Sequence, residues 1–331
     1  MIHPTPPGTR DILPEEMREL RALEASLRGA FDEHGYGEVS TPTIEYAEAL
    51  RRGDERYANA AYRFFDERGE LLAMRSDMTI PIARLVSTRM PDVEPPIRLS
   101  YIANAFRAVN PQRGQMREFT QAGVELLGAP APDGTAEVIE VLSAALDAAG
   151  LTRAVVGLGD ADLYRQLLGE LGVPDEAGER ILDRLATHDL VGLELAVDDV
   201  EGLAAEARAT LLALPAMRGG PEVLDHATEL GGQAVKRATG RMRATYESLA
   251  ARGVADRVQL DLGLLRDLGY YTGAILEVYD PALGHILGGG GRYDGLLGRF
   301  GRELPAVGFA LYVERLHVAQ AEEERAGAEV R

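Results

Sequence analysis

Residues 105–128, with the sequence AFRAVNPQRGQMREFTQAGVELLG, restrict the possible folds of this chain more than any other stretch. They read as two strands joined by a polar loop over 108–117, a pattern that predicts a long hairpin. Because a hairpin joins antiparallel strands, the chain is expected to build an antiparallel sheet around this segment.

The second strand of this hairpin carries polar side chains where a sheet core would need apolar ones. Alternate residues of a strand share a face, so Gln121 and Glu125 are neighbours on one side. Arg107, at the end of the first strand, is expected on the same surface. A cation, an amide and a carboxylate together suit a zwitterionic ligand. The stretch alone leaves open the alternative of a solvated face with incidental salt bridges.

The order of the remaining elements predicts an α+β fold rather than alternating βαβ units. Apolar residues at helical spacing predict a helix from about Leu20 to Phe31 and another over 135–146. A glycine cluster, a last strand and a helix end the chain. Short apolar runs bounded by turn residues predict strands at 63–66, 71–78, 97–106, 258–263 and 274–280.

The segment 172–252 differs from its surroundings because it is rich in Ala, Leu, Glu and Arg at helical spacing. It is interpreted as a helical insertion that divides a core domain into two parts, about 1–171 and 253–317. The last residues, 318–331, are expected to form a charged and frayed tail.

Cysteine and histidine usage excludes several kinds of site. The chain contains no cysteine, which rules out disulfides, thiolate zinc sites and cysteine nucleophiles. Its six histidines are scattered without the HxxxH or HExxH spacing of metal-binding helices. Neither a metal ion nor a cofactor is therefore expected.

Charge and hydropathy exclude further classes of protein. The formal net charge of -18 opposes binding to nucleic acid, because that affinity comes largely from lysine and arginine. Binding to tRNA is therefore not expected. A membrane-spanning segment would need a run of about 18 apolar residues, and the sequence has neither such a run nor a charged apolar leader. These features predict a cytoplasmic protein without membrane contact.

Six motifs, taken in order, carry a resemblance to a known family. They are PPGTRDILPEE near the start, MRSDMT at 74–79, FRAVNPQRGQMREFTQAGVE at 106–125, LLRDLGYYTG at 264–273, GGRYDGL at 290–296 and AVGFALYVERL at 306–316. Together they resemble the histidyl-tRNA synthetases, which are class II aminoacyl-tRNA synthetases. The resemblance covers nearly the whole chain and implies an antiparallel sheet of six or more strands, flanked by helices, in a homodimer.

The resemblance also implies a histidine pocket. The family's positions for the α-ammonium group match Asp77, Thr79 and Gln121. Its positions for the imidazole ring match Glu125 and Tyr271.

Further residues of the implied pocket hold the carboxylate and form the wall. Arg266 would face the carboxylate, and Arg107 belongs to the same histidine-binding set. Missing side chains would let the ligand approach the backbone of the wall. The wall is formed by Tyr270, Gly289, Gly290 and Gly291. Taken singly, the tyrosines also read as core aromatics and the glycines as a turn.

The implied nucleotide site is incomplete. Val109 and Gln115 stand where synthetases carry a glutamate for adenine and an arginine for the ATP phosphates. Loss of one donor that stabilises developing charge commonly costs about 10²- to 10³-fold in rate. Phe119 and Arg315 still match ATP contacts, so the resemblance implies a remnant nucleotide site. No catalytic residue is expected.

The end of the chain points to a subfamily. Only the short segment 317–331 follows the last motif, so no anticodon-binding domain, normally about a hundred residues, is expected. This truncation, with the degraded activation site, resembles the regulatory subunits of ATP phosphoribosyltransferase, which are synthetase-like partners of a short catalytic subunit.

That resemblance implies a non-catalytic subunit of a larger hetero-oligomer. It would be required by the catalytic subunit in the first step of histidine biosynthesis and would sense L-histidine for feedback inhibition. Two alternatives stay open. One is a short synthetase-like enzyme that adenylates an amino acid, and the other is an activating scaffold with a vestigial pocket.

Overall fold

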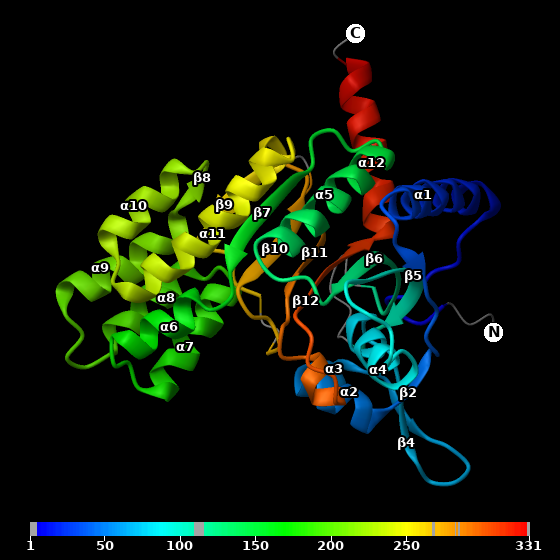
Figure 1. Cartoon of the computed structure of the whole chain (residues 1–331), viewed down its shortest axis with the longest axis horizontal. Helices are drawn as coiled ribbons and strands as arrows, with labels where there is room; N and C mark the ends of the chain where they lie inside the picture. Colours follow the sequence, from blue (N-terminus) through cyan, green and yellow to red (C-terminus); the bar gives the residue numbers. More distant parts are fainter. Residues whose placement is uncertain (1–4, 109–115, 267–268, 282, 284, 330–331) are drawn as a thin grey trace.

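The computed structural model describes residues 5–108, 116–266, 269–281, 283 and 285–329, and its centre is a nine-stranded sheet (Figure 1). The strand order is β1-β5-β6-β12-β11-β10-β7-β9-β8. Neighbouring strands are antiparallel except for two parallel pairs, β1 with β5 and β7 with β9. The predicted α+β fold with a mainly antiparallel sheet is confirmed. The strands are β1 (Gly37–Glu38), β5 (Ile97–Phe106), β6 (Glu118–Leu127), β7 (Val155–Asp160), β8 (Arg218–Gly219), β9 (Val258–Asp261), β10 (Ala274–Tyr279), β11 (Ile286–Arg292) and β12 (Ala306–Tyr312).

The predicted hairpin is the longest ladder of the sheet. Strands β5 and β6 pair antiparallel along ten residues each, with Leu99 opposite Glu125 and Ala103 opposite Gln121. The alternation along β6 holds as expected. Val124 and Leu126 lie in the large hydrophobic core, whereas Gln121 and Glu125 are buried polar residues on the other face.

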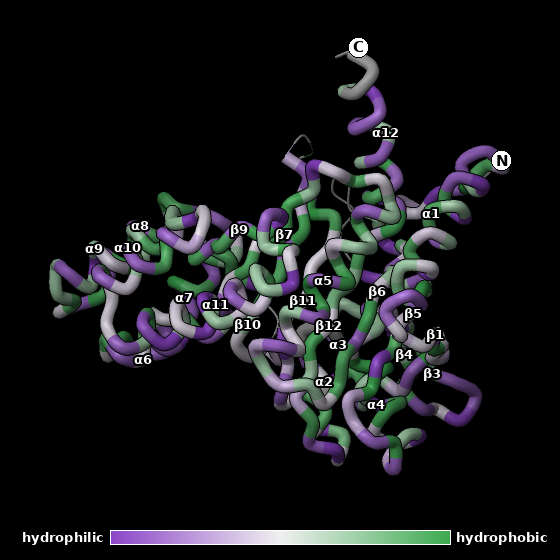
Figure 2. The backbone as a smooth tube through the Cα atoms, turned by 45° about the horizontal axis from the view of Figure 1, so that its top comes forward, coloured by the Kyte–Doolittle hydropathy of each residue, from purple (hydrophilic) through white to green (hydrophobic). Residues whose placement is uncertain are grey.

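A helical layer covers the apolar face of the sheet. Among the helices that contribute to this core are α1 (Pro14–Glu33), α5 (Asp133–Ala148) and α12 (Val313–Glu329), and helices from the segment 163–251 extend it. The expected helices at 20–31 and 135–146 correspond to α1 and α5. Figure 2 shows the hydrophobic residues gathered along the central strands.

The polar face of the sheet is covered by smaller elements. They include α4 (Thr79–Arg89) and the short helix η3 (Leu297–Phe300), which form a second core with Leu99 and Tyr101 of β5. A separate sheet in the order β2-β4-β3 lies beside them. Its strands are β2 (Ile44–Tyr46), β3 (Arg63–Phe65) and β4 (Leu71–Met74). The short helices α2 (Ala47–Gly53) and α3 (Glu55–Ala60) lie between β2 and β3 in the chain.

Residues 163–251 form a helical lobe beside the β7–β9 end of the sheet (Figure 1). Asp160 at the end of β7 accepts two hydrogen bonds from Arg241, both 2.8 Å long, which connects the lobe to the sheet. The boundaries 172 and 252 for an insertion stay a prediction. The helices are α6 (Leu163–Glu170), α7 (Asp175–Ala186), α8 (Leu190–Asp198), α9 (Ala205–Ala213), η1 (Leu214–Ala216), α10 (Glu222–Leu230) and α11 (Gln233–Ala251), and η2 (Ala255–Arg257) follows.

At two places the structure decides against a sequence reading: the alternative of a turn at the glycine cluster, and the expected frayed tail. The glycine cluster begins as strand β11, not as a turn, and Gly288 to Gly291 pair with β10 and β12 on both sides. The segment after His317 is not frayed but continues α12, because distant groups hold it. The side-chain amide of Gln320 donates to the Ala149 carbonyl at 2.7 Å, and the Glu323 carboxylate accepts from the Arg153 amide at 3.0 Å.

The strand expected at 71–78 is shorter than its apolar run. It ends at Met74, and the following residues enter α4 at Thr79. Among the described residues, no helix combines the length and apolar character needed to cross a bilayer.

Candidate functional site

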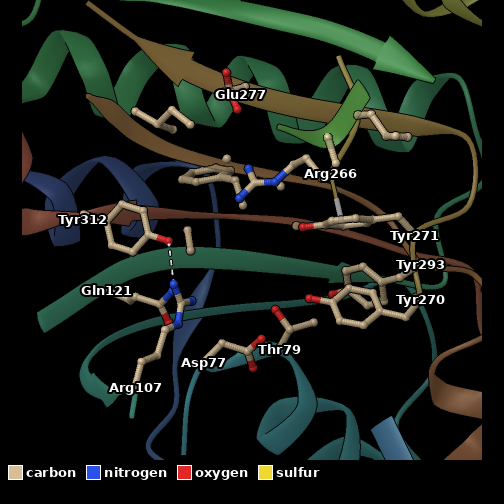
Figure 3. Close-up of a pocket in the computed structure, with 18 residues that line it drawn as sticks. Asp77, Thr79, Arg107, Gln121, Arg266, Tyr270, Tyr271, Glu277, Tyr293 and Tyr312 are labelled. Atoms are coloured by element: carbon tan, nitrogen blue, oxygen red, sulfur yellow. Dashed lines mark hydrogen bonds between the residues drawn. The ribbon is translucent and has the colours of Figure 1, made fainter. Parts of the chain in front are cut away.

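A cavity of about 320 Å³ lies on the polar face of the main sheet (Figure 3). Small-molecule pockets commonly occupy about 300–1,000 Å³, so this cavity suits a ligand of amino-acid size. Nine of the implied site residues line it: Asp77, Thr79, Arg107, Gln121, Arg266, Tyr270, Tyr271, Gly289 and Gly290. Glu125 lies behind Thr79, and Gly291 packs near the Tyr271 ring.

One side of the cavity presents oxygen acceptors. Asp77 and Thr79 occupy the start of α4, where the Asp77 carboxylate accepts a 3.4 Å hydrogen bond from the Ile80 amide. The Oε1 atom of Gln121 is buried and has no hydrogen-bond partner among the described residues. A buried acceptor without a partner costs free energy, so this carbonyl oxygen is poised to accept from a ligand.

Glu125 forms the floor between α4 and the sheet. Its Oε1 accepts from the Thr79 hydroxyl at 2.8 Å, and its Oε2 accepts from the Tyr293 hydroxyl. Burial raises the pKa of Glu125 to about 8 and outweighs these two hydrogen bonds, which lower it, while the charge of Asp77 adds to the rise. The carboxyl group is therefore largely protonated at neutral pH and can share its proton with a basic ligand group.

The carboxyl group of Glu125 has room because its cross-strand neighbour lacks a side chain. Gly308 lies opposite Glu125 in the β6–β12 ladder, and a Cβ at position 308 would overlap Glu125 Oε2. Gly289 serves Arg266 in the same way, since a Cβ there would overlap the Arg266 guanidinium. Because Gly289 has no side chain, Arg266 can cross the backbone of β11 and donate to the Leu276 carbonyl at 3.1 Å.

Three tyrosines form an aromatic corner of the cavity. The ring centroids of Tyr270 and Tyr271 are 4.9 Å apart, and those of Tyr270 and Tyr293 are 5.8 Å apart. Sequence reasoning missed Tyr293. The alternation from Gly289 through Gly291 to residue 293 would have placed it on the same face.

Cationic groups gather around Tyr312 at the cavity wall. The Arg107 guanidinium donates to the Ser76 carbonyl at 3.2 Å and to the Tyr312 hydroxyl at 3.3 Å (Figure 3). Burial alone would raise the pKa of Tyr312, but the charges of Arg107, Arg266 and Arg315 outweigh it and lower the pKa to about 8. Such clustered guanidinium groups favour an anionic part of a ligand.

The arginine side of the cavity also contains two residues that were not expected. Glu277 lines the cavity near Arg266, and burial raises its pKa above the usual range despite the opposing charge of Arg266. Ala186, the last residue of α7, contributes a wall from the helical lobe.

The implied nucleotide residues, Phe119 and Arg315, do not line the cavity. Phe119 packs edge to face against Tyr312, with ring centroids 5.4 Å apart. Val109 and Gln115 lie outside the described residues. Among the residues that are described, no group of three or more histidine, aspartate or glutamate side chains is arranged to hold a metal ion.

Comparisons with a family model and with individual known proteins agree on one family. The model of the histidyl-tRNA synthetase family matches residues 8–316. The chain is 42% identical to the ATP phosphoribosyltransferase regulatory subunit of Desulforamulus reducens, over 95% of this chain and 78% of that protein. It is 44% identical to the same subunit of Symbiobacterium thermophilum, over 98% of this chain and 82% of that protein.

Solved structures agree with these relatives. An ATP phosphoribosyltransferase regulatory subunit/histidyl-tRNA synthetase from Bacillus halodurans superposes with a TM-score of 0.89 at 33% identity, covering 97% of this chain and 84% of that one. A histidine–tRNA ligase subunit from Alicyclobacillus acidocaldarius gives a TM-score of 0.83 at 30% identity, covering 98% of this chain and 99% of that one.

Proposed function

This chain belongs to the family of ATP phosphoribosyltransferase regulatory subunits with a histidyl-tRNA synthetase-like fold, and we propose that it regulates its partner by binding L-histidine in the cavity on the polar sheet face. The names of its relatives, ATP phosphoribosyltransferase regulatory subunits, imply a regulatory role in histidine biosynthesis. The proposed partner is the ATP phosphoribosyltransferase catalytic subunit.

The observation that carries this proposal is the arrangement of charges around the cavity. In this proposal Asp77 and the free acceptor of Gln121 hold the ammonium group, and Arg107 and Arg266 hold the carboxylate, since all four line the cavity. Glu125 adds a buried acid that can share a proton with an imidazole ring. Binding of such a ligand can regulate an enzyme only if one conformation of the complex binds it better than another.

We further propose that two copies of the chain associate. The small sheet exposes an apolar face on which Tyr46, Leu72 and Phe64 lie side by side across its three strands. Ile44 on β2 extends this exposed face. A second copy is the proposed occupant, because the synthetase-like family is expected to form homodimers and monomers seldom leave large apolar patches in water.

The proposal includes no catalysis by this chain and no tRNA ligand. The net charge of -18 supports the absence of a nucleic-acid partner, and the regulatory relatives support the absence of catalysis. A cytoplasmic location is part of the same proposal and rests on the biosynthetic role of those relatives.

The first test of the proposal is assembly. Mixing the chain with a short ATP phosphoribosyltransferase catalytic subunit is expected to form a complex larger than either component and to raise phosphoribosyl transfer in a coupled assay. Light scattering measures the mass, and histidine is then titrated into the active complex, where inhibition should follow calorimetric occupancy of this chain. A strict monomer that leaves the catalytic subunit inactive would contradict the assignment.

A second test concerns activation chemistry. We expect no histidine-dependent exchange of pyrophosphate into ATP above the background of a blank reaction, because Val109 and Gln115 replace an adenine contact and a cationic phosphate contact. Loss of one donor that stabilises developing charge commonly costs about 10²- to 10³-fold in rate. The control is a histidyl-tRNA synthetase assayed in parallel. Exchange at the rate of that control would instead identify the chain as an adenylating enzyme.

A further inference from the structure

The side chain of Tyr312 lies between an aromatic ring and a guanidinium group beside the cavity. Its ring contacts Phe119, with centroids 5.4 Å apart at an interplanar angle of 71°. The Arg315 guanidinium lies over the same tyrosine ring, 4.5 Å from its centroid. Aromatic rings and guanidinium groups are common partners of a nucleic-acid base, and here the Tyr312 ring fills the space between two such groups.

Hydrogen bonds fix this arrangement. Arg107 donates to the Tyr312 hydroxyl at 3.3 Å, and the Arg107 guanidinium also lies 4.8 Å from the Phe119 centroid. Arg315 donates to the Ile286 carbonyl at 2.6 Å. Tyr312 therefore fills the space between Phe119 and Arg315 and accepts a hydrogen bond from Arg107.

Side-chain size increases along β12 on the face that lines the cavity. Alternate residues of β12 share a face, and Gly308, Ala310 and Tyr312 all line the cavity. Gly308 leaves space for the Glu125 carboxyl group, Ala310 adds only a methyl group, and Tyr312 fills the space at its position with a ring. A compact ligand does not need the space that Tyr312 fills, whereas a ligand with a second ring system would need it.

We propose that Tyr312 determines the specificity of the cavity by admitting a free amino acid and excluding purine nucleotides. This inference rests on the proposed ligand site, since it describes which ligands that site accepts. In this proposal nucleotides are excluded by the Tyr312 side chain itself, and not only by the loss of the nucleotide contacts that are missing from the sequence.

The test measures binding of ATP and of AMP by calorimetry. Wild-type protein is expected to bind neither nucleotide with a dissociation constant below about 1 mM. Tyr312→Gly should bind AMP and ATP at least about tenfold more tightly, because stacking of one base on an aromatic side chain corresponds to roughly ten- to a hundredfold in affinity. Tyr312→Phe keeps the ring and should remain like the wild type.

Two further variants make the result decisive. Phe119→Ala placed in the Tyr312→Gly background should abolish the gain, which shows that the nucleotide binds in the vacated space. If circular dichroism shows that Tyr312→Gly does not fold, Tyr312→Ala carries the same expectation. Tight nucleotide binding by the wild type, or folded glycine and alanine variants as weak as the wild type, would overturn the inference. Histidine titration of the wild type tests the proposed function separately, because no nucleotide enters that measurement.

Discussion

Replacing Glu125 by glutamine is expected to weaken L-histidine binding by roughly ten- to more than a hundredfold, the worth of one hydrogen bond to a charged group. The pKa of Glu125 is raised to about 8, so the empty site holds a neutral acid at pH 7, and glutamine matches that acid in shape and charge. The variant should therefore fold and assemble normally. It cannot share a proton with the imidazole ring, and calorimetry on wild-type and variant complexes measures the loss.

The pH dependence of binding gives a second measurement of the same effect. At pH values between the pKa of imidazole, about 6.5, and that of Glu125, about 8, the free imidazole ring is neutral and the free Glu125 carboxyl group is protonated. The bound pair also holds one proton, so binding in this range neither releases nor takes up a proton. Below this window one proton must be released, so affinity falls as the pH decreases. Above it one proton must be taken up, so affinity falls as the pH increases. Glutamine at position 125 should remove the loss near pH 8.

Feedback inhibition decides whether this pocket is the sensor. If Glu125→Gln lowers affinity and shifts the inhibition curve by the same factor, the histidine that regulates the complex binds here. Unchanged inhibition in an assembled variant complex would place the regulatory histidine elsewhere and leave this cavity as a vestigial pocket.

Gly308→Ala is expected to disrupt both the fold and the ligand site. The new Cβ would overlap the Glu125 carboxyl group and lie 2.5 Å from the Val124 carbonyl oxygen of the neighbouring strand. Overpacking costs about 1–3 kcal/mol, and separating the buried acid from Thr79 and Tyr293 costs about 1–3 kcal/mol more. We expect the free energy of unfolding to fall by roughly 2–6 kcal/mol, measured by denaturant titration, and histidine binding to weaken more than about a hundredfold.

The matched control is the same substitution at an open glycine. Gly240 lies on the exposed side of α11, and a Cβ there would meet nothing within 4 Å. Alanine is the better helix former, so Gly240→Ala should raise the free energy of unfolding by about 0.5–1 kcal/mol. If Gly308→Ala instead matches the wild type in stability and in histidine affinity, the carboxyl group of Glu125 is not held by the contacts described here.

The sequence was most informative where side chains repeat with a regular period. The two-residue period of β6 predicted which residues face the core and which face the cavity, and the helical spacing after Pro14 predicted α1. Strand β11 was missed because four consecutive glycines carry no pattern of apolar and polar side chains. Its strand state depends on backbone pairing with β10 and β12, which are separate segments of the chain.

The candidate site shows the same limit. Motifs identified nine of the residues that line the cavity, but Tyr293 and Tyr312 were not among them. Tyr293 gains its importance from Glu125, which is 168 residues away, and Tyr312 from Arg107, which is 205 residues away. Such contacts depend on how the strands are ordered in the sheet, and local patterns do not contain that order.

Ala186 gives the helical lobe a direct share in the cavity wall. A ligand that fills this cavity would contact a residue of α7 as well as the sheet, and its affinity would depend on where that helix lies. Any protein that binds the lobe and displaces α7 changes the ligand's affinity by some factor. Because the two binding equilibria form a closed thermodynamic cycle, the ligand must change that protein's affinity by the same factor.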